Sequence, residues 1–300
     1  MQAKTIVKNQ STEIALERYT TNSVTSKDGT RIGYRQFGHG LGVVLLHGAM
    51  ESAHSHMQLA GFLADTFTVY LPDRRGRGLS GPFGPDHSIR KEVEDLDALL
   101  SKTGTRHVFG VSAGGLICLQ AALLLPAIRK MVLYEPVLSV SGSVSTAFLA
   151  RYDQEIAQGR LASALVSGML GAQMGPAVFN ALPRWLLELI TTLAMNAEDK
   201  KAQAGDVTMR LLAPTLHYDF QLVVEMSQAL ESFKAVPAEV LLLGGSASPA
   251  YLKLALNAIE KALPHARRIE FPGFNHGASG NTDRGGQPER VAQELRNFFA

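Results

Sequence analysis

Ser112 is the residue of this chain whose surroundings best suit covalent chemistry. It is the centre of the pentad Gly110-Val111-Ser112-Ala113-Gly114. The apolar runs on either side predict a strand over residues 106–110 and a helix over residues 113–125, so the serine would lie on a tight strand-to-helix turn. The flanking glycines remove the Cβ atoms that would collide with the neighbouring strand and helix. Ser112 is therefore a candidate nucleophile.

Two further side chains with acid–base chemistry follow predicted strands. Glu135 comes directly after the strand predicted over residues 130–134, and His276 follows the one over residues 267–271. In an open parallel sheet, ligands bind beyond the carboxyl ends of the strands, because loops and helix N-termini converge there. The chain order serine, acid, histidine thus predicts a site at one edge of a sheet.

Strands and helices alternate through most of the chain, as in a parallel sheet with helices on both faces. A hairpin is predicted over residues 23–38, and βα units follow it. The alternation stops at residues 138–236, where the sequence predicts several helices and no strand. It resumes with a strand over residues 238–245 and ends with a helix over residues 288–299.

The predicted organisation is one catalytic unit with an insertion. Residues 1–22 are a polar leader, residues 23–137 and 237–300 form the α/β core, and residues 138–236 form the helical insertion. No shift in composition marks a linker between separate domains.

The chain resembles the α/β-hydrolase family in four places. These are His47-Gly48 after a strand, the run over residues 73–80, the serine turn, and the segment over residues 273–277. The resemblance extends from about Ser23 to Phe299. It implies a mostly parallel, doubly wound sheet of the α/β-hydrolase type, with a helical cap inserted after the sixth strand.

The resemblance also assigns roles to the candidate residues. It makes Ser112 the nucleophile and His276 the general base that takes its proton. It places the two donors of an oxyanion hole at the backbone N–H groups of Ala49 and Ala113, with Met50 as the alternative to Ala49. Removing one such donor typically costs about 2.7–4 kcal/mol of transition-state stabilisation.

The acid partner of the histidine departs from the commonest family pattern, which has an aspartate after the strand at residues 240–243. The loop over residues 244–249 has no carboxylate. Glu135 is the predicted substitute, and one subgroup of haloalkane dehalogenases and the lactone hydrolases that open zearalenone are similar in this respect. Asp219 in the insertion is the reserve candidate, although an ion pair between cap and core is the simpler interpretation of it.

Other polar residues near these motifs are interpreted as structural. His47 would anchor the oxyanion loop by hydrogen bonds. Asp73 would tie down the loop after its strand, and we expect the arginines beside it, at positions 74, 75 and 77, to support this loop rather than to bind an anionic substrate. His54 and His56 could edge the pocket, although solvated helix positions are the simpler interpretation.

Composition excludes several kinds of partner. Lys and Arg number 29 against 27 Asp and Glu, and no basic stretch contains interleaved aromatic residues, so we expect no nucleic acid. We find no signal peptide and no apolar run of about 18 residues, which predicts a cytoplasmic protein without a membrane segment. The single cysteine, Cys118, excludes an intrachain disulfide. No phosphate-binding, dinucleotide or metal-ligand motif is present, so no cofactor and no metal are expected.

The sequence therefore predicts a serine hydrolase that cleaves a carboxylic ester or lactone of a small, fairly hydrophobic substrate. Two alternatives stay open: a carbon–carbon bond hydrolase or perhydrolase with the same triad, and a ligand receptor that has the fold without turnover. A homo-oligomer also stays open. Apolar residues of the insertion are expected to supply the pocket walls, although packing between helices or against the core is the more expected role of each one: Met169, Met174, Phe179, Trp185, Leu186, Met195, Leu211 and Leu216.

Overall fold

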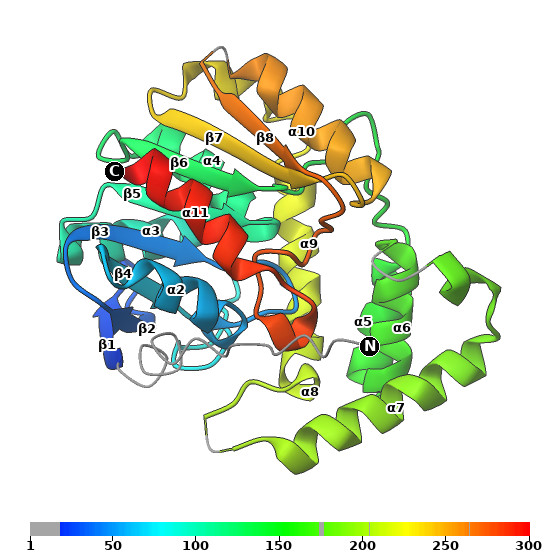
Figure 1. Ribbon diagram of the computed structural model, residues 1–300. Helices are drawn as coiled ribbons and strands as arrows, with labels where there is room; N and C mark the ends of the chain where they lie inside the picture. The colour runs from blue at the N-terminus through cyan, green and yellow to red at the C-terminus, as the bar shows by residue number, and fades with distance from the viewer. Residues whose placement is uncertain (1–18, 174–176, 204, 264) are drawn as a thin grey trace, which may run out of the picture.

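An eight-stranded sheet forms the centre of the molecule in the computed structural model, which describes residues 19–173, 177–203, 205–263 and 265–300 (Figure 1). The strands are Tyr19–Thr25 (β1), Arg31–Phe37 (β2), Leu41–Leu46 (β3), Phe67–Pro72 (β4), His107–Val111 (β5), Lys130–Tyr134 (β6), Glu239–Gly245 (β7) and Arg267–Phe271 (β8). They lie in the order β1-β2-β4-β3-β5-β6-β7-β8. β2 runs antiparallel to β1 and β4, and the other neighbours are parallel. The predicted α/β class with a mostly parallel sheet is confirmed.

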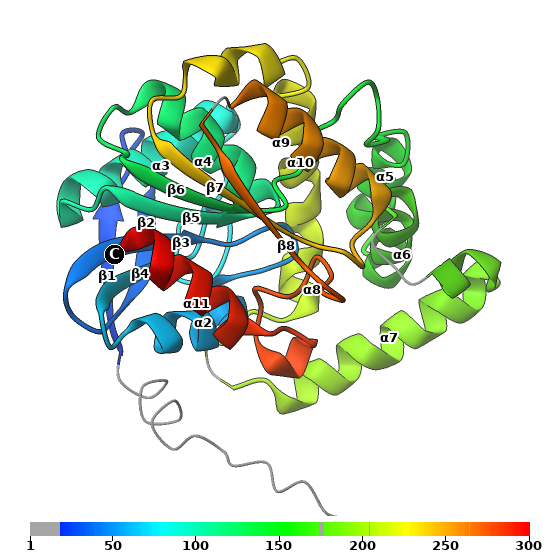
Figure 2. The ribbon, with the colours of Figure 1, turned by 45° about the horizontal axis from the view of Figure 1, so that its top comes forward.

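Helices cover both faces of this sheet. Figures 1 and 2 show α2 and α11 on one face and α3, α4 and α10 on the other. Their bounds are Met57–Leu63 (α2), Ile89–Thr103 (α3), Ala113–Leu124 (α4), Ala250–Ala262 (α10) and Pro288–Phe299 (α11). Along β3, Val43 and Leu45 pack in the layer with α2 and α11, while Val44 and Leu46 pack in the other layer. Because both faces are buried, the central strands are continuous apolar runs rather than alternating ones.

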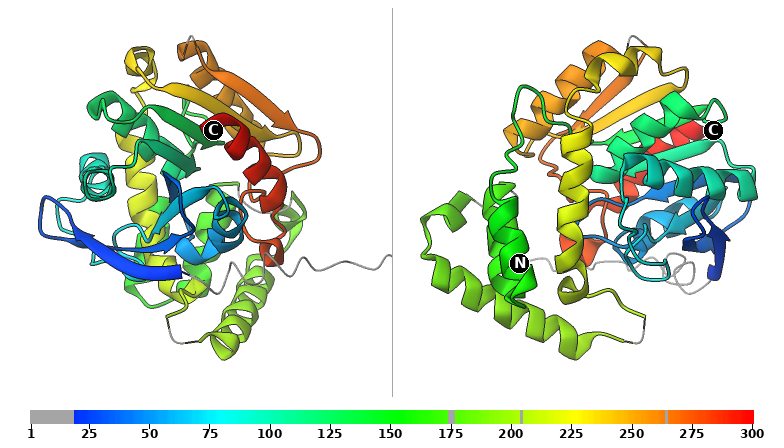
Figure 3. Two further views of the ribbon diagram at one scale, coloured as in Figure 1. Left: turned by 60° about the vertical axis from the view of Figure 1, so that its left-hand side comes forward. Right: turned by 180° about the vertical axis from the view of Figure 1, so that it is seen from behind.

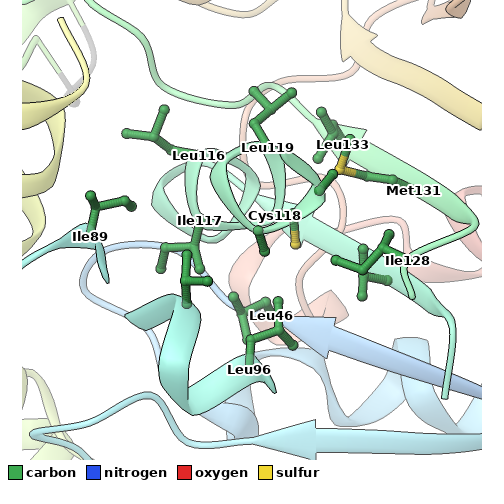
Figure 4. Packing of buried hydrophobic residues seen from close by; sticks show 14 of the residues in the cluster. Leu46, Ile89, Leu96, Leu116, Ile117, Cys118, Leu119, Ile128, Met131 and Leu133 are labelled. Atoms are coloured by element: carbon green, nitrogen blue, oxygen red, sulfur yellow. The ribbon is translucent and has the colours of Figure 1, made fainter. Parts of the chain in front are cut away.

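Cys118 lies inside the layer formed by α3 and α4 (Figure 4). It belongs to the same apolar cluster as Leu46, Leu96 and Ile128. Burial raises the pKa of its thiol. The cysteine is therefore a neutral packing residue rather than a reactive one.

The segment between β6 and β7 contains helices and no strand among its described residues. Its elements are α5 (Leu149–Ala157), α6 (Leu161–Gly171), η2 (Ala177–Ala181), α7 (Arg184–Lys201), α8 (Met209–Leu212), η3 (Ala213–Thr215), α9 (Leu216–Glu225) and η4 (Leu230–Ala235), where η marks a 3-10 helix. α5 packs on α6, α6 on α7, and α9 on α4 of the core. The helices from α5 to α9 lie beyond the carboxyl ends of the strands, where they form a cap (Figures 1 and 3), whereas η4 packs on α4 and α10 of the core. None of the described helices is long and apolar enough to cross a membrane.

Two predicted elements differ from the structure by more than one residue at an end. β1 begins at Tyr19, so the last four residues of the predicted leader, 19–22, belong to the sheet; residues 1–18 lie outside the described part. Six of the seven residues of β1 are exposed, so this edge strand lacks the apolar alternation that reveals a strand. The helix predicted over residues 51–64 is a 3-10 turn, Ala53–His56 (η1), followed by α2.

The carboxylate of Asp73 organises the loop that follows β4. It accepts hydrogen bonds from Arg35 Nη1 at 2.9 Å, from the N–H of Ala53 at 2.8 Å and from the N–H of Leu79 at 2.9 Å. Asp73 and Arg35 are both buried. The carboxylate therefore joins β2, η1 and the loop in one network, as the sequence predicts for Asp73.

Asp73→Asn is expected to lower the free energy of unfolding by about 3–5 kcal/mol, because buried Arg35 would lose its ionic partner. Urea denaturation followed by circular dichroism measures the change. The control is Asp86→Asn, at an exposed carboxylate paired with Lys91, which should cost less than about 1 kcal/mol. Equal losses in the two variants would contradict this role of Asp73.

His87 lies where the cap meets the core. Its buried ring packs edge-on against Phe83 and against Tyr218 of α9, and neither ring nitrogen has a hydrogen-bond partner among the described residues. Burial lowers the pKa of His87 to about 4, whereas an unfolded histidine titrates near 6.5. Unfolding therefore takes up a proton between these values, so His87 makes stability fall as pH decreases from about 6.5 towards 4.

His87→Phe is expected to fold as well as wild type at pH 7, since no hydrogen bond is lost, and to lose less stability between pH 7 and pH 5. Urea denaturation at both pH values gives the two differences. His39→Gln, at an exposed position, is the control and should keep the wild-type pH dependence. An unchanged pH dependence in His87→Phe would show that His87 does not carry this effect.

Candidate active site

Ser112 occupies a strained turn between β5 and α4. Its φ of 53° and ψ of −120° are unusual for a residue with a side chain. The N–H of Ser112 donates to the carbonyl of Tyr134 on β6 at 3.1 Å, and its carbonyl accepts the N–H of Leu116 at 3.2 Å. These bonds fix the serine at the end of β5 and at the first turn of α4.

The steric reason for the flanking glycines is confirmed. A Cβ atom at Gly110 would lie 2.6 Å from the carbonyl oxygen of Gly114. A Cβ atom at Gly114 would lie 2.4 Å from the carbonyl oxygen of Leu46 and 2.6 Å from that of His47. Because these are backbone atoms, the turn that carries Ser112 excludes any side chain at either position.

Glu135 and His276 meet at the same edge of the sheet. His276 Nδ1 donates to Glu135 Oε2 at 2.8 Å, and the N–H of Gly245 at the end of β7 donates to Glu135 Oε1 at 2.7 Å. The side chain of Glu135 is fully buried. Since a carboxylate only accepts hydrogen bonds, the proton of neutral His276 is on Nδ1 and its Nε2 is an acceptor.

Ser112 and His276 line one cavity between the core and the cap. Its other walls are Ala49, Ala113, Val137, Val144, Ala172, Asp219, Phe220, Val223 and Tyr251. The cavity measures about 30 Å³, which is room for about two water molecules. In the part of the chain that the structure describes, no hydrogen bond joins Ser112 to His276; such bonds are often long without substrate and shorten in the reacting complex.

Asp219 is not the partner of His276. Its Oδ1 accepts a hydrogen bond from Arg74 Nη1 at 2.8 Å, and its Oδ2 accepts one from Arg77 Nη2. All three side chains are buried. The carboxylate thus pairs the cap helix α9 with the loop after β4, which is the simpler of the two roles that the sequence allows.

In the loop after β3, both backbone polar groups of Gly48 are hydrogen-bonded to side chains. Its N–H donates to Glu51 Oε2 at 2.7 Å, and its carbonyl accepts His47 Nδ1 at 2.9 Å and Arg74 Nη1 at 3.5 Å. The Gly48–Ala49 peptide is trans. In a trans peptide the C=O and the following N–H point in opposite directions, so the N–H of Ala49 is directed away from His47 and Arg74.

His47 is a neutral anchor of this loop. Nε2 accepts the N–H of Arg74 at 3.1 Å, so the proton is on Nδ1, which donates to the carbonyl of Gly48. Burial, reinforced by the charges of Arg77 and Arg74, holds the pKa of His47 well below its ordinary value. Its ring contacts the loop after β3 and does not line the cavity, in keeping with the structural role predicted for it.

A family model described as the alpha/beta hydrolase family matches residues 43–294. The chain belongs to this family. It is 26% identical to an uncharacterized hydrolase, YraK, of Bacillus subtilis over 268 residues, which cover 85% of this chain and 89% of that protein. An alpha/beta hydrolase of Sphaerobacter thermophilus is 29% identical, with a TM-score of 0.74 over 93% of this chain and all of that one. A shorter match of 95 residues, 31% of this chain and 35% of the other, is 34% identical to a non-heme haloperoxidase of Rhodococcus erythropolis.

Glu51 and Tyr251 lie beside the site of this α/β hydrolase and were not predicted from its sequence. Glu51 binds the N–H of Gly48 and also accepts a hydrogen bond from His56 Nε2 at 3.2 Å. His56 is buried and not solvated as expected, because its Nδ1 also bonds the carbonyl of Ser279 at 3.0 Å. Tyr251, in the first turn of α10, lines the cavity. Its position directly after the loop that follows β7 could have indicated this from the sequence, because such loops lie at the site.

The cap supplies apolar walls to the cavity, but through other residues than those named for this role. Phe220 and Val223 of α9 and Ala172 after α6 line the cavity instead. Trp185 on α7 is 66% exposed, and Leu216 is buried inside the cap. Apolar residues on several faces of neighbouring helices do not reveal from sequence which face meets the ligand. Met174 lies outside the described residues.

The described residues contain no group of three His, Cys, Asp or Glu that could hold a metal.

Gly114→Ala is expected to lower the free energy of unfolding by about 1–3 kcal/mol, because its Cβ overlaps two backbone oxygens. It should also slow the reaction of Ser112 with a fluorophosphonate, measured by intact-protein mass spectrometry. In the control Gly84→Ala the new Cβ meets only the exposed side chain of Asp86, at 3.2 Å. If Gly114→Ala behaved like Gly84→Ala, the steric account of the turn would be wrong.

Proposed function

We propose that this protein is a serine hydrolase that cleaves a carboxylic ester or lactone of a small, fairly hydrophobic substrate through an acyl-enzyme on Ser112. One observation carries the proposal. Glu135 holds the proton of His276 on Nδ1, so the accepting Nε2 belongs to a ring that lines the same cavity as Ser112. A hydroxyl with an oriented base beside it is the arrangement that nucleophilic acyl transfer requires.

In the first half of the reaction, His276 Nε2 takes the proton of Ser112 while Oγ attacks the carbonyl carbon of the substrate. The buried Glu135 carboxylate stabilises the imidazolium that forms. The N–H groups of Ala49 and Ala113 receive the developing negative charge on the carbonyl oxygen. His276 then donates its proton to the departing alkoxide, and the acyl group stays on Ser112.

In the second half, water replaces the alcohol. His276 takes a proton from the water, which attacks the acyl carbon, and the second tetrahedral intermediate collapses to release Ser112 and a carboxylic acid. A lactone yields a hydroxy acid by the same steps. The same groups of the protein therefore serve both halves in opposite directions.

The cavity supports an uncharged substrate. Its walls are largely aliphatic and aromatic, and the one carboxylate among them, Asp219, is neutralised by Arg74 and Arg77. Tyr251 adds a hydroxyl: burial and the neighbouring Glu135 raise the pKa of Tyr251 to about 12, so it stays a hydrogen-bond donor. Such walls favour an ester or lactone with one further polar oxygen over a charged or extended polymer.

A perhydrolase is the second candidate, because the 95-residue match to a non-heme haloperoxidase favours it. An acyl-enzyme attacked by hydrogen peroxide in place of water would yield a peracid with the same residues. Assays of a short-chain ester in water and in added hydrogen peroxide, with the products separated by chromatography, distinguish the two. A dominant peracid product would favour the second candidate.

Ser112→Ala should abolish turnover of short-chain p-nitrophenyl esters, and Glu135→Gln should lower kcat by about 10⁴ with little change in KM, because the imidazole loses its orientation. Steady-state kinetics measure both. Glu231→Gln, at an exposed carboxylate of η4, is the control and should match wild type. Negligible turnover by wild type, together with tight binding of the product, would instead favour a receptor.

A further inference from the structure

One side chain connects the cap with the loop that carries Ala49. The guanidinium of Arg74 is buried between three partners. It donates to Glu92 of α3 at 3.1 and 2.6 Å, to Asp219 of α9 at 2.8 Å, and to the carbonyl of Gly48 at 3.5 Å. The last two bonds come from the same nitrogen, Nη1. The position of Nη1 relative to Gly48 therefore depends on Asp219, a residue of the cap.

We propose that Arg74 is a positioning residue through which Asp219 of the cap helix α9 holds the oxyanion hole in its working geometry. Nη1 reaches Gly48 while Asp219 holds it, and the carbonyl of Gly48 then faces Arg74 and His47. In this orientation the N–H of Ala49 points the opposite way and is available to the substrate oxygen. The inference rests on the proposed function, since it assigns a use to that N–H.

The other partners of Arg74 explain why Asp219 is decisive. The Glu92 carboxylate accepts hydrogen bonds from both Nε and Nη2 of Arg74. Only Nη1 is then left for Asp219 and Gly48. Among the described residues, Asp219 is the carboxylate that draws Nη1 away from Glu92; without it, a small shift of the guanidinium towards Glu92 would lengthen the 3.5 Å contact with Gly48. Gly48 would then keep only the neutral donor of His47, and a bond from a neutral donor is weaker than one from a charged group.

The place of α9 in the fold gives this link a function. Asp219 belongs to a helix that is fixed to the core, because Leu222 and Val223 of α9 pack in the same apolar cluster as α4 and Glu225 Oε2 accepts the N–H of Ile89 at 2.8 Å. Since α9 is held in this way, the Asp219 carboxylate gives Nη1 of Arg74 a fixed position next to Gly48. The cap helix α9 thus supports the oxyanion hole through Arg74.

Arg74→Lys and Asp219→Asn test the link. A lysine has one nitrogen and cannot bind Glu92, Asp219 and Gly48 together, while the asparagine keeps its shape and loses its charge. Each should slow phosphonylation of Ser112 by a fluorophosphonate at least tenfold and lower kcat for p-nitrophenyl esters similarly, with KM changed less. Because both act through one peptide, the double variant should be no slower than the slower single one.

The matched control is Asp95→Asn. It removes the carboxylate from the neighbouring buried pair, in which Arg75 donates to Asp95 at 2.7 Å twice, without touching Gly48 or the cap. All rates are measured where circular dichroism shows each variant folded. The control should stay within twofold of wild type, although it too is less stable.

The outcomes separate the two proposals. Wild-type labelling rates in Arg74→Lys and Asp219→Asn, or equal slowing in Asp95→Asn, would overturn the coupling and leave the hydrolase proposal intact. Effects that multiply in the double variant would also overturn it, since they would show two independent paths. A wild-type protein that neither reacts with the probe nor cleaves any ester would overturn both.

Discussion

The carboxylate of Glu135 is the constraint on which the rest of the site depends. It lies at the end of β6, accepts the N–H of Gly245 at the end of β7, and orients His276 from the loop after β8. The commonest family pattern has its acid after β7, but here a Cβ at Gly245 would lie 2.1 Å from the carbonyl oxygen of Phe274. The backbone at the end of β7 thus comes too close to its neighbour for a side chain at Gly245, and the N–H of this glycine donates to the glutamate.

The charged groups that the described residues place around the cavity are paired: Asp219 with Arg74 and Arg77, and Glu135 with His276. Buried ion pairs add little net stability, because the desolvation of both groups offsets their attraction. Their contribution here is geometric. Arg74 and Arg77 attach α9 to the core, and Asp73 fixes the loop after β4 that carries both arginines. The cavity walls that remain are apolar, which strengthens every electrostatic interaction within the cavity.

The sheet, its two helix layers and the meeting of Glu135 with His276 were predictable from sequence because they follow from strong local signals. Buried parallel strands are continuous apolar runs, and polar residues directly after such strands gather at one edge of the sheet. The lining of the cavity was not predictable in this way. Phe220 and Val223 differ from Leu216 only in which side of α9 they occupy, and that side is set by contacts with α4 and α5 that no single helix encodes.

The same reasoning explains why the network around Gly48 could not be found in the sequence. Glu51 and Arg74 are separated by 22 further residues, and neither belongs to a motif that requires the other. Both side chains bind the backbone of Gly48. Glu51 accepts a hydrogen bond from its N–H, and Arg74 donates to its carbonyl, which belongs to the peptide between Gly48 and Ala49. A backbone amide has no side chain to mark it, so a site built from such groups is specified by the residues that hold its neighbours. In this protein those residues include Arg74, which is itself paired with Asp219, a carboxylate of the cap.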